Sequence, residues 1–160
     1  MFNRYNNAVE FNGKAEDVLE VLAWFKELIY DKGAGWQMGG EKFSNISFLG
    51  DGRIWFESNG DSGPEILREI AEEFRVGFVH YFGKNSYYGE AVFSQGNLHI
   101  TVLDEDDLGS IGYDETIMSY TVGQRPFANH RDAIDHLLAQ KKLENQPGQN
   151  EADNYRGQKR

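Results

Sequence analysis

The chain has 160 residues, of which 39% are hydrophobic and 14% aromatic, so it is long enough to build one packed domain. It contains no cysteine, which excludes a disulfide framework, a thiolate zinc site and a cysteine nucleophile. The longest apolar run covers only residues 21–25, and the first residues are mostly polar. We therefore expect no membrane-spanning helix and no secretory signal, and we place the protein in the cytoplasm.

Charge gives the first indication of function. The sequence has 26 acidic and 16 basic residues, a net charge of −10, and its last twenty residues carry more basic than acidic side chains. The acidic excess therefore lies in residues 1–140, where it should repel the phosphates of nucleic acids. Three interpretations stay open: a solubilised protein with no charged partner, a binder of basic protein surfaces, or a mimic of phosphate groups.

The N-terminal part contains a strand and a helix. Residues 5–11 alternate, with Val9 and Phe11 on one face, as in a half-buried strand. Apolar residues then recur every three or four positions between 18 and 29, which predicts a helix with one buried stripe. Four glycines between 33 and 40 predict an irregular connection after this helix.

A hairpin and a second helix follow. Two β-rich runs between residues 46 and 57 flank an Asp-Gly pair, which is a strong hairpin signal. The next segment has a capping-box pattern, with Ser62 as the N-cap and Glu65 three residues later. This pattern predicts a helix that begins just after Ser62.

The order of elements predicts the fold class. Strands are expected at 76–82, 87–93 and 98–103, so the chain runs β-α-β-β-α-β and then adds a hairpin. This order is typical of an α+β, ferredoxin-like (split βαβ) antiparallel sheet with two helices on one face. Beyond Leu103 we expect an irregular stretch and a short C-terminal helix from Asn129. The prediction is a single domain over residues 1–143, with a disordered tail over 144–160.

The start of the chain resembles a known family. Its order of asparagines, alternating apolar residues and a closing glycine is similar to the opening of the YubB-like family of plasmid and phage proteins, which have an Api-type ferredoxin-like domain. The matching residues are Asn3, Asn7, Val9, Phe11 and Gly13. The family usually has Trp-Cys where this chain has Arg4-Tyr5, which is a departure.

A second similarity supports the first. Residues 71–76 lead to Tyr81-Phe82 and then to Tyr88-Gly89-Glu90, which follows the family's order of helix end, strand and aromatic-Gly pair. The resemblance extends over roughly residues 1–105. It implies a ferredoxin-like fold and a setting in bacterial mobile genetic elements, and it implies no catalytic residues.

The motifs of common active sites are missing from the sequence. No Gly-x-Ser-x-Gly elbow and no phosphate-binding glycine loop occurs. His80 and His99 fall in neighbouring strand regions, while His130 and His136 lie on different faces of the last helix, so we expect no metal site. We predict a protein that is not an enzyme and needs no cofactor.

Two functions remain from these observations. The first is an acidic module of a mobile element that binds a host or element-encoded protein with a basic surface. One form of this hypothesis is an antagonist of a host nucleic-acid-binding or defence protein. The alternative is a single-stranded nucleic-acid-binding domain that uses the open sheet face. The net charge argues against this second hypothesis. Six residues are the candidate partner-binding site, chosen for their charge or expected exposure: Trp55, Glu57, Asp104, Glu105, Asp106 and Asp107.

Overall fold

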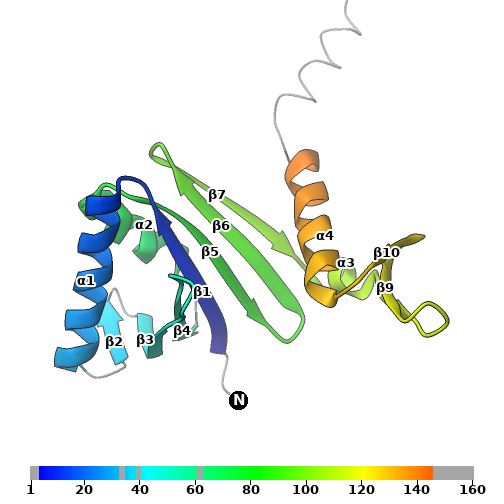
Figure 1. Ribbon diagram of the computed structural model, residues 1–160, viewed down its shortest axis with the longest axis horizontal. Helices are drawn as coiled ribbons and strands as arrows, with labels where there is room; N and C mark the ends of the chain where they lie inside the picture. The colour runs from blue at the N-terminus through cyan, green and yellow to red at the C-terminus, as the bar shows by residue number, and fades with distance from the viewer. Residues whose placement is uncertain (1–3, 33–34, 39–40, 61–62, 146–160) are drawn as a thin grey trace, which may run out of the picture. The chain divides into compact units, whose positions relative to one another are not determined.

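A computed structural model describes residues 4–32, 35–38, 41–60 and 63–145 (Figure 1). The chain divides into two compact units, residues 1–100 and 101–160. The first contains two long helices and a seven-stranded sheet whose last strand ends in the second unit. We expected one domain over residues 1–143. None of the helices in the described ranges is long and apolar enough to cross a membrane.

The first unit has the split βαβ arrangement that the sequence predicts. Strand β1 is central and pairs antiparallel with both β4 and β5, while β3 pairs with β4. This order arises because α1 and α2 each connect two strands that follow one another in the sequence but are not neighbours in the sheet. The six elements are β1 (Arg4–Asn12), α1 (Ala15–Lys32), β3 (Glu41–Phe48), β4 (Ile54–Asn59), α2 (Pro64–Phe74) and β5 (Gly77–Lys84).

Three further strands extend this sheet at both edges. The full order is β2-β3-β4-β1-β5-β6-β7, and β6 (Tyr87–Ser94) with β7 (Asn97–Leu103) forms the expected extra hairpin. Strand β2 (Gly35–Met38) was not expected, because the four glycines between 33 and 40 indicated an irregular connection. Its backbone pairs in register with β3, from Gly35 opposite Ser44 to Met38 opposite Glu41.

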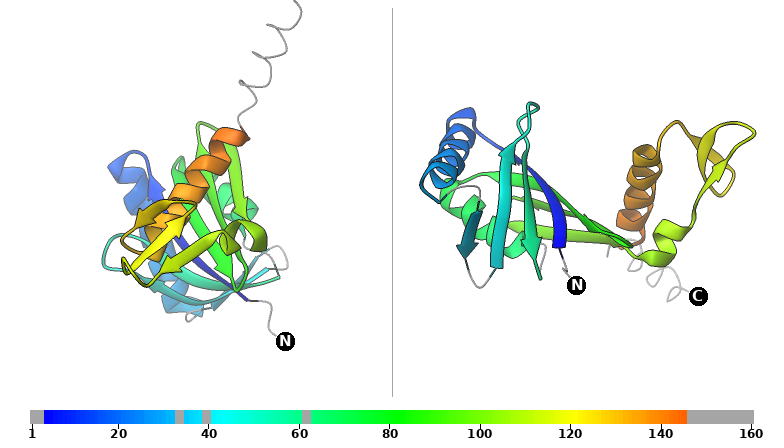
Figure 2. Two further views of the ribbon diagram at one scale, coloured as in Figure 1. Left: turned by 90° about the vertical axis from the view of Figure 1, so that its right-hand side faces the viewer. Right: turned by 90° about the horizontal axis from the view of Figure 1, so that it is seen from below.

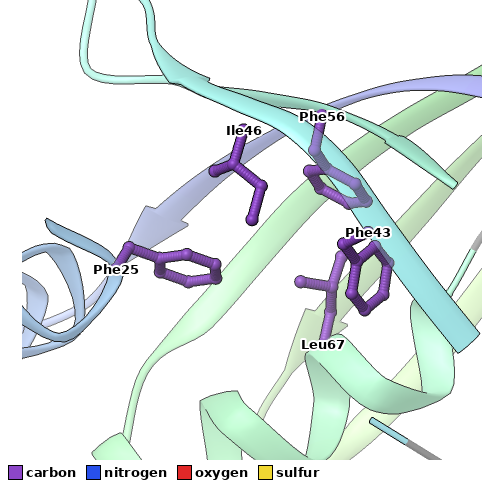
Figure 3. Close-up of a pocket in the computed structure, with 5 residues that line it drawn as sticks. All are labelled: Phe25, Phe43, Ile46, Phe56 and Leu67. Carbon is purple, nitrogen blue, oxygen red and sulfur yellow. The ribbon is translucent and has the colours of Figure 1, made fainter. Parts of the chain in front are cut away.

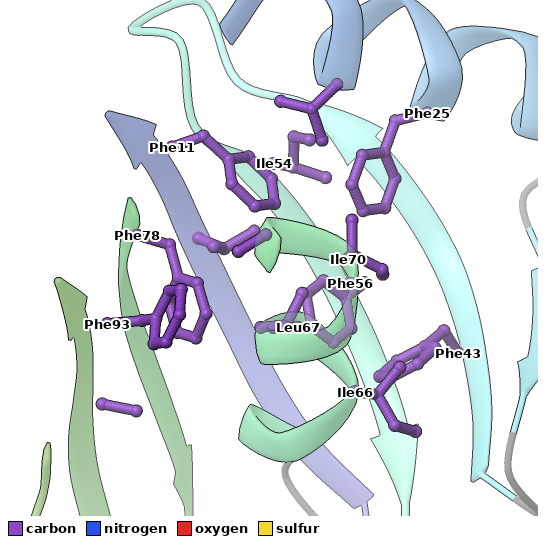
Figure 4. Packing of buried hydrophobic residues seen from close by; sticks show 14 of the residues in the cluster. Phe11, Phe25, Phe43, Ile54, Phe56, Ile66, Leu67, Ile70, Phe78 and Phe93 are labelled. Carbon is purple, nitrogen blue, oxygen red and sulfur yellow. The ribbon is translucent and has the colours of Figure 1, made fainter. Parts of the chain in front are cut away.

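The core lies between the sheet and the two helices. Strand β1 alternates between buried and more exposed residues along its whole length, and its inward positions Val9 and Phe11 face the helices. The helices contribute Phe25 from α1 and Leu67 from α2, which point toward the same apolar layer (Figure 4). Both helices therefore cover one face of the sheet, as the sequence predicts.

Helix α2 begins one residue later than the capping-box pattern indicates. Its N-cap is Gly63, in a left-handed conformation with φ 82°, and no side chain among the described residues caps the helix. A Cβ atom at this position would lie 2.8 Å from the Phe43 ring, so glycine permits both the turn and the close packing. The prediction of Ser62 as the N-cap was therefore wrong, and Ser62 itself lies outside the described residues.

The second unit has more regular structure than the sequence indicates. The stretch beyond Leu103, expected to be irregular, contains a short helix and a three-stranded sheet ordered β10-β9-β8, with α4 (orange) beside it (Figure 2). Its strands are only three or four residues long, which explains why their periodicity was not recognised. The elements are α3 (Glu105–Gly109), β8 (Ile111–Asp114), β9 (Ser119–Val122), β10 (Arg125–Phe127) and α4 (His130–Glu144).

The last helix begins where the sequence predicts. Asn129 is the N-cap of α4, and its side-chain oxygen accepts a hydrogen bond from the backbone N–H of Asp132 at 2.8 Å. The inward side of the helix buries Ala133, Ile134, Leu137 and Leu138. Most of the tail expected over 144–160 lies outside the described residues.

Candidate interaction surfaces

The sheet face opposite the helices carries a row of aromatic side chains. Ala8 of β1 lies in register between Trp55 of β4 and Tyr81 of β5, and all three are half-buried. The Tyr81 ring stacks on Tyr88 of β6, with 6.4 Å between their centroids and 25° between their planes. The candidate residue Trp55 therefore belongs to an aromatic band on β4, β5 and β6, in which β1 contributes Ala8 between Trp55 and Tyr81.

Glu57 lies on the same face as Trp55, but its carboxylate is engaged within the protein. Its Oε2 atom accepts hydrogen bonds from the Asn45 side chain at 2.7 Å and from Arg4 at 3.3 Å. Only 19% of the Glu57 side chain is exposed. This carboxylate is therefore poorly placed to form a charged contact with a partner protein.

The acidic run at residues 104–107 forms the start of helix α3. Asp104 is the N-cap, and its side chain and that of Asp107 bond reciprocally to each other's backbone N–H groups. Asp107 also accepts a hydrogen bond from Lys141 at 2.9 Å, which holds the pKa of its carboxyl below the usual value. Two of the four acids thus have structural roles, while Glu105 and Asp106 are exposed.

The six candidate residues are divided between the two units. Trp55 and Glu57 lie on β4 in the first unit, whereas residues 104–107 lie in the second. We chose these residues from the sequence for their charge or expected exposure. Neither property shows which carboxylates already have partners within the protein.

The outer side of α1 carries four carboxylates in one row, which we call the α1 acidic stripe. Helical geometry of about 3.6 residues per turn places them within roughly 60° of one another, with successive spacings along the axis of about 6, 10 and 6 Å. All four are exposed, and none forms an ion pair among the described residues. They are Glu16, Glu20, Glu27 and Asp31.

Two large apolar side chains lie beside this stripe. Leu19 is 66% exposed and Tyr30 is 90% exposed. Along the helix axis they lie on either side of Ala23, which is also exposed. Around the axis all three positions fall within about 40° of arc. Helix α1 therefore presents an apolar strip and an acidic strip side by side, on the side away from the core.

Helix α2 has an acidic outer side of a different kind. Arg68 lies between two of its acids, with 3.2 Å to the Glu65 carboxylate and 4.0 Å to that of Glu72. None of the large hydrophobic side chains that are strongly exposed in the described part of the chain belongs to α2. Its outer side is thus partly neutralised and wholly polar.

The net charge of the first unit comes from its helices. Within their bounds α1 and α2 have nine acidic residues against three basic ones, whereas the rest of residues 1–100 has six of each. The sheet and its loops are therefore balanced, and the net charge of the whole chain says little about the aromatic face. The spacing of 16, 20, 27 and 31 was visible in the sequence and could have located the α1 acidic stripe.

A buried polar network crosses the core below α1 and α2. The Asn7 side chain donates to Ser58 Oγ at 3.0 Å, and its oxygen contacts His80 Nε2 at 2.9 Å. His80 is fully buried among phenylalanine rings, and this burial lowers its pKa to about 3. The network has no access to solvent, so we assign it a structural role.

The other histidines do not form a metal site either. His99 is exposed on β7, and β6 separates it from His80, so the two do not face each other. His130 packs against the Tyr120 ring and His136 against the Phe127 ring. No group of three or more metal-ligating side chains lies together in the part of the chain that the structure describes.

The first unit contains a cavity in its core and an open cleft at its surface. One, in the core, is lined only by Phe25, Phe43, Ile46, Phe56 and Leu67 and has a volume of about 10 Å³ (Figure 3). It is at the lower limit for one water molecule and offers that water no polar partner.

The second cavity is an open cleft of about 400 Å³ at the C-terminal end of α2. Its charged residues are Glu72 and Arg75, and Arg75 is paired with Asp17 at 3.2 Å. The outer sides of the helices therefore remain the best candidates for interaction.

Comparison with known proteins agrees with the fold. The family model described as "Ferredoxin-like domain in Api92-like protein" matches residues 36–123, which is more than half of the chain. The match runs from β2 to the turn after β9, so it includes the aromatic face and α2, while β1 and α1 precede it. No curated protein and no solved structure matches the chain.

Proposed function

This chain belongs to the family of ferredoxin-like domains in Api92-like proteins, and we propose that it is a non-enzymatic module whose helix α1 binds a basic surface of another protein. The observation that carries the proposal is the α1 acidic stripe, whose four carboxylates form no ion pair among the described residues. A basic partner would supply the missing counter-charges.

The neighbouring apolar strip supports a protein partner. Leu19 and Tyr30 together provide exposed apolar surface, which contributes to affinity when a partner removes it from water. Tyrosine is also one of the residues most often found at the energetic centre of protein interfaces. The charges should set orientation and association rate, while the apolar strip should contribute most of the binding free energy.

The spacing of the carboxylates suggests what the partner normally binds. Successive phosphates of a nucleic-acid strand lie several ångströms apart, and the acidic stripe has spacings of about 6 Å within each of its two pairs. We propose that the target is a host nucleic-acid-binding or defence protein in the cytoplasm, and that α1 occupies its phosphate-binding surface. The resemblance of the first thirteen residues to plasmid and phage proteins motivates this setting.

A second function is favoured by one specific observation. The aromatic band of Trp55, Tyr81 and Tyr88 lies on a sheet face whose unit has balanced charge outside its helices. Exposed aromatic rings on a sheet of this topology can stack on unpaired bases. Single-stranded nucleic acid is therefore the alternative partner.

Pull-downs from bacterial lysate with and without nuclease treatment, each at low and at moderate salt, distinguish the two functions. The proposal expects a basic protein that survives nuclease treatment and is released as the salt concentration rises. Trp55→Ala should leave that capture unchanged. Recovery of nucleic acid from untreated lysate, abolished by Trp55→Ala, would instead support the alternative and reject the binding role of α1.

A further inference from the structure

The hairpin between β8 and β9 presents apolar side chains at its tip. Ile117 is 53% exposed and Met118 is 76% exposed, and Tyr113, just before the tip, is 53% exposed. All three are among the large hydrophobic residues that are strongly exposed in the part of the chain that the structure describes. Their contribution to the folded state of the second unit is correspondingly small.

The backbone at the tip makes the choice of residue more unusual. Met118 has φ 50°, in the left-handed region where glycine or asparagine is normally favoured. A methionine there costs free energy in the backbone and also exposes an apolar side chain. Neither cost helps the unit to fold, so an interaction outside the unit is the better explanation for the residue.

The tip is held in place rather than loosely attached. The backbone N–H of Thr116 donates to Asp114 Oδ1 at 2.8 Å, and the Ser119 hydroxyl donates to the Ile117 carbonyl at 3.2 Å. Behind the tip, Tyr113 packs against Tyr120 with 5.1 Å between ring centroids. A tip with this support loses little conformational entropy when it binds.

The charges around the tip are of one sign. Residues 111–122 contain Asp114 and Glu115 and no basic residue, and Arg125 pairs with Val122 at the opposite end of the strands. Acidic flanks should repel an anionic membrane surface. They are complementary to a basic rim around an apolar pocket on a protein.

We propose that this tip is a second docking element, which inserts Ile117 and Met118 into an apolar pocket with a basic rim on a partner protein. It lies in the second unit, so it is independent of the α1 acidic stripe and of the function proposed for that stripe. The two surfaces can be tested separately with substitutions at exposed positions.

The test is a selection of random linear peptides on the full chain, with counter-selection on the double variant Ile117→Ser/Met118→Ser. We expect the recovered peptides to combine Lys or Arg with large apolar residues. They should bind the wild-type protein at least tenfold more tightly than the double variant. A single variant, Met118→Lys, should lose at least as much affinity because it adds repulsion from the basic peptides.

The matched control is Leu143→Ser, at an exposed apolar position of α4 in the same unit, which should bind the selected peptides within twofold of wild type. Thermal unfolding midpoints of all variants should stay close to that of wild type, since every substituted side chain is exposed. The proposal is overturned by peptides that bind the double variant equally well, by peptides without a basic bias, or by a failure to select any. A wild-type dimer that the double variant converts to a monomer would also overturn it, because the tip would then contact a second copy.

Discussion

The two helices that cover the sheet are alike on their inner sides and different on their outer sides. Inside, α1 contributes Phe25 and α2 contributes Leu67 to the same apolar cluster. Outside, α2 has Arg68 between two of its acids, whereas α1 has four exposed acids beside the exposed side chains of Leu19 and Tyr30. Folding explains the inner sides of both helices, and it leaves the outer side of α1 unexplained.

The difference teaches which features to assign to function. Pairing acids with an arginine and keeping apolar residues inside is what a solvent-facing helix normally does. Helix α2 follows this pattern, so its acidity is accounted for by solubility. Helix α1 departs from it in both charge and polarity, and this is why the proposal places the partner there.

The largest effects on stability should come from substitutions on the inner sides of the two helices, which contribute to the same apolar cluster. Phe25→Ala should lower the free energy of unfolding by about 4 kcal/mol and Leu67→Ala by about 3 kcal/mol, because each substitution enlarges a cavity that the core cannot refill. Urea unfolding measures both values. Leu19→Ala, on the outer side of α1, should change stability by less than about 0.5 kcal/mol. A large loss at Leu19 would mean that the outer side also packs in the fold.

His80, in the core beneath both helices, should make the free energy of unfolding depend on pH. Its pKa is about 3 in the folded protein and about 6.5 in the unfolded chain, so below pH 6.5 the unfolded state binds a proton that the folded state does not. Stability should be full above pH 6.5 and fall as the pH decreases toward 3. Between pH 7 and pH 5 the loss should be on the order of 2 kcal/mol.

The control for this prediction is His80→Gln, which keeps an N–H donor for Asn7 and does not titrate. Its unfolding free energy should change less over the same pH range, and His99→Gln, at an exposed position, should behave like wild type. Identical pH profiles for wild type and His80→Gln would show that His80 is not the group responsible.

Much of the first unit could be predicted from its sequence. Alternation in β1, the apolar stripe of α1 and the Asp-Gly turn are local patterns, and each of them directly specifies an element. Strand β2 was missed because its glycines favour a loop, and it is a strand only through pairing with β3. In the second unit, strands of three or four residues are too short to show alternation.

The candidate site was harder to predict than the fold. Trp55 was chosen for its expected exposure and is half-buried, whereas the partners of Glu57 come from residues 4 and 45 on other strands. The contact between Asp107 and Lys141 also joins two separate elements, α3 and α4. Sequence patterns identify charged residues without showing which of them are already paired, and only the tertiary structure separates the two groups.

A moderate effect is expected from the apolar strip on α1. Leu19→Ser/Tyr30→Ser should weaken binding to the captured basic partner by tenfold or more, or about 1.4 kcal/mol, because apolar contacts supply most of the affinity. Stability should stay the same, since both side chains are exposed. Titration calorimetry with the purified partner measures the change. An affinity within twofold of wild type would leave only the charges as the binding feature.

The smallest effect on stability is expected when α2 loses its arginine, so that its acids lack an ion pair among the described residues, as those of the α1 acidic stripe do. Arg68→Gln removes the cation between Glu65 and Glu72 and should lower stability by about 0.5 kcal/mol at low salt, with a smaller loss at high salt. Thermal unfolding at two ionic strengths measures it. A loss that does not change with salt would mean that Arg68 acts through packing rather than charge.

The most direct test of the α1 assignment compares two matched sets of substitutions. One neutralises the stripe on α1 (Glu16→Gln, Glu20→Gln, Glu27→Gln and Asp31→Asn), and the other neutralises the four acids of α2 (Glu65→Gln, Glu69→Gln, Glu72→Gln and Glu73→Gln). Each removes four negative charges, so the two variants have the same net charge. The quantity to measure is the affinity of each variant for the captured basic partner at one fixed salt concentration.

If α1 is the binding surface, the α1 variant should bind at least tenfold more weakly than wild type, and the α2 variant should stay within twofold. Equal losses in the two variants would contradict the account, because they would show that the partner responds to net charge and not to the row of carboxylates on α1.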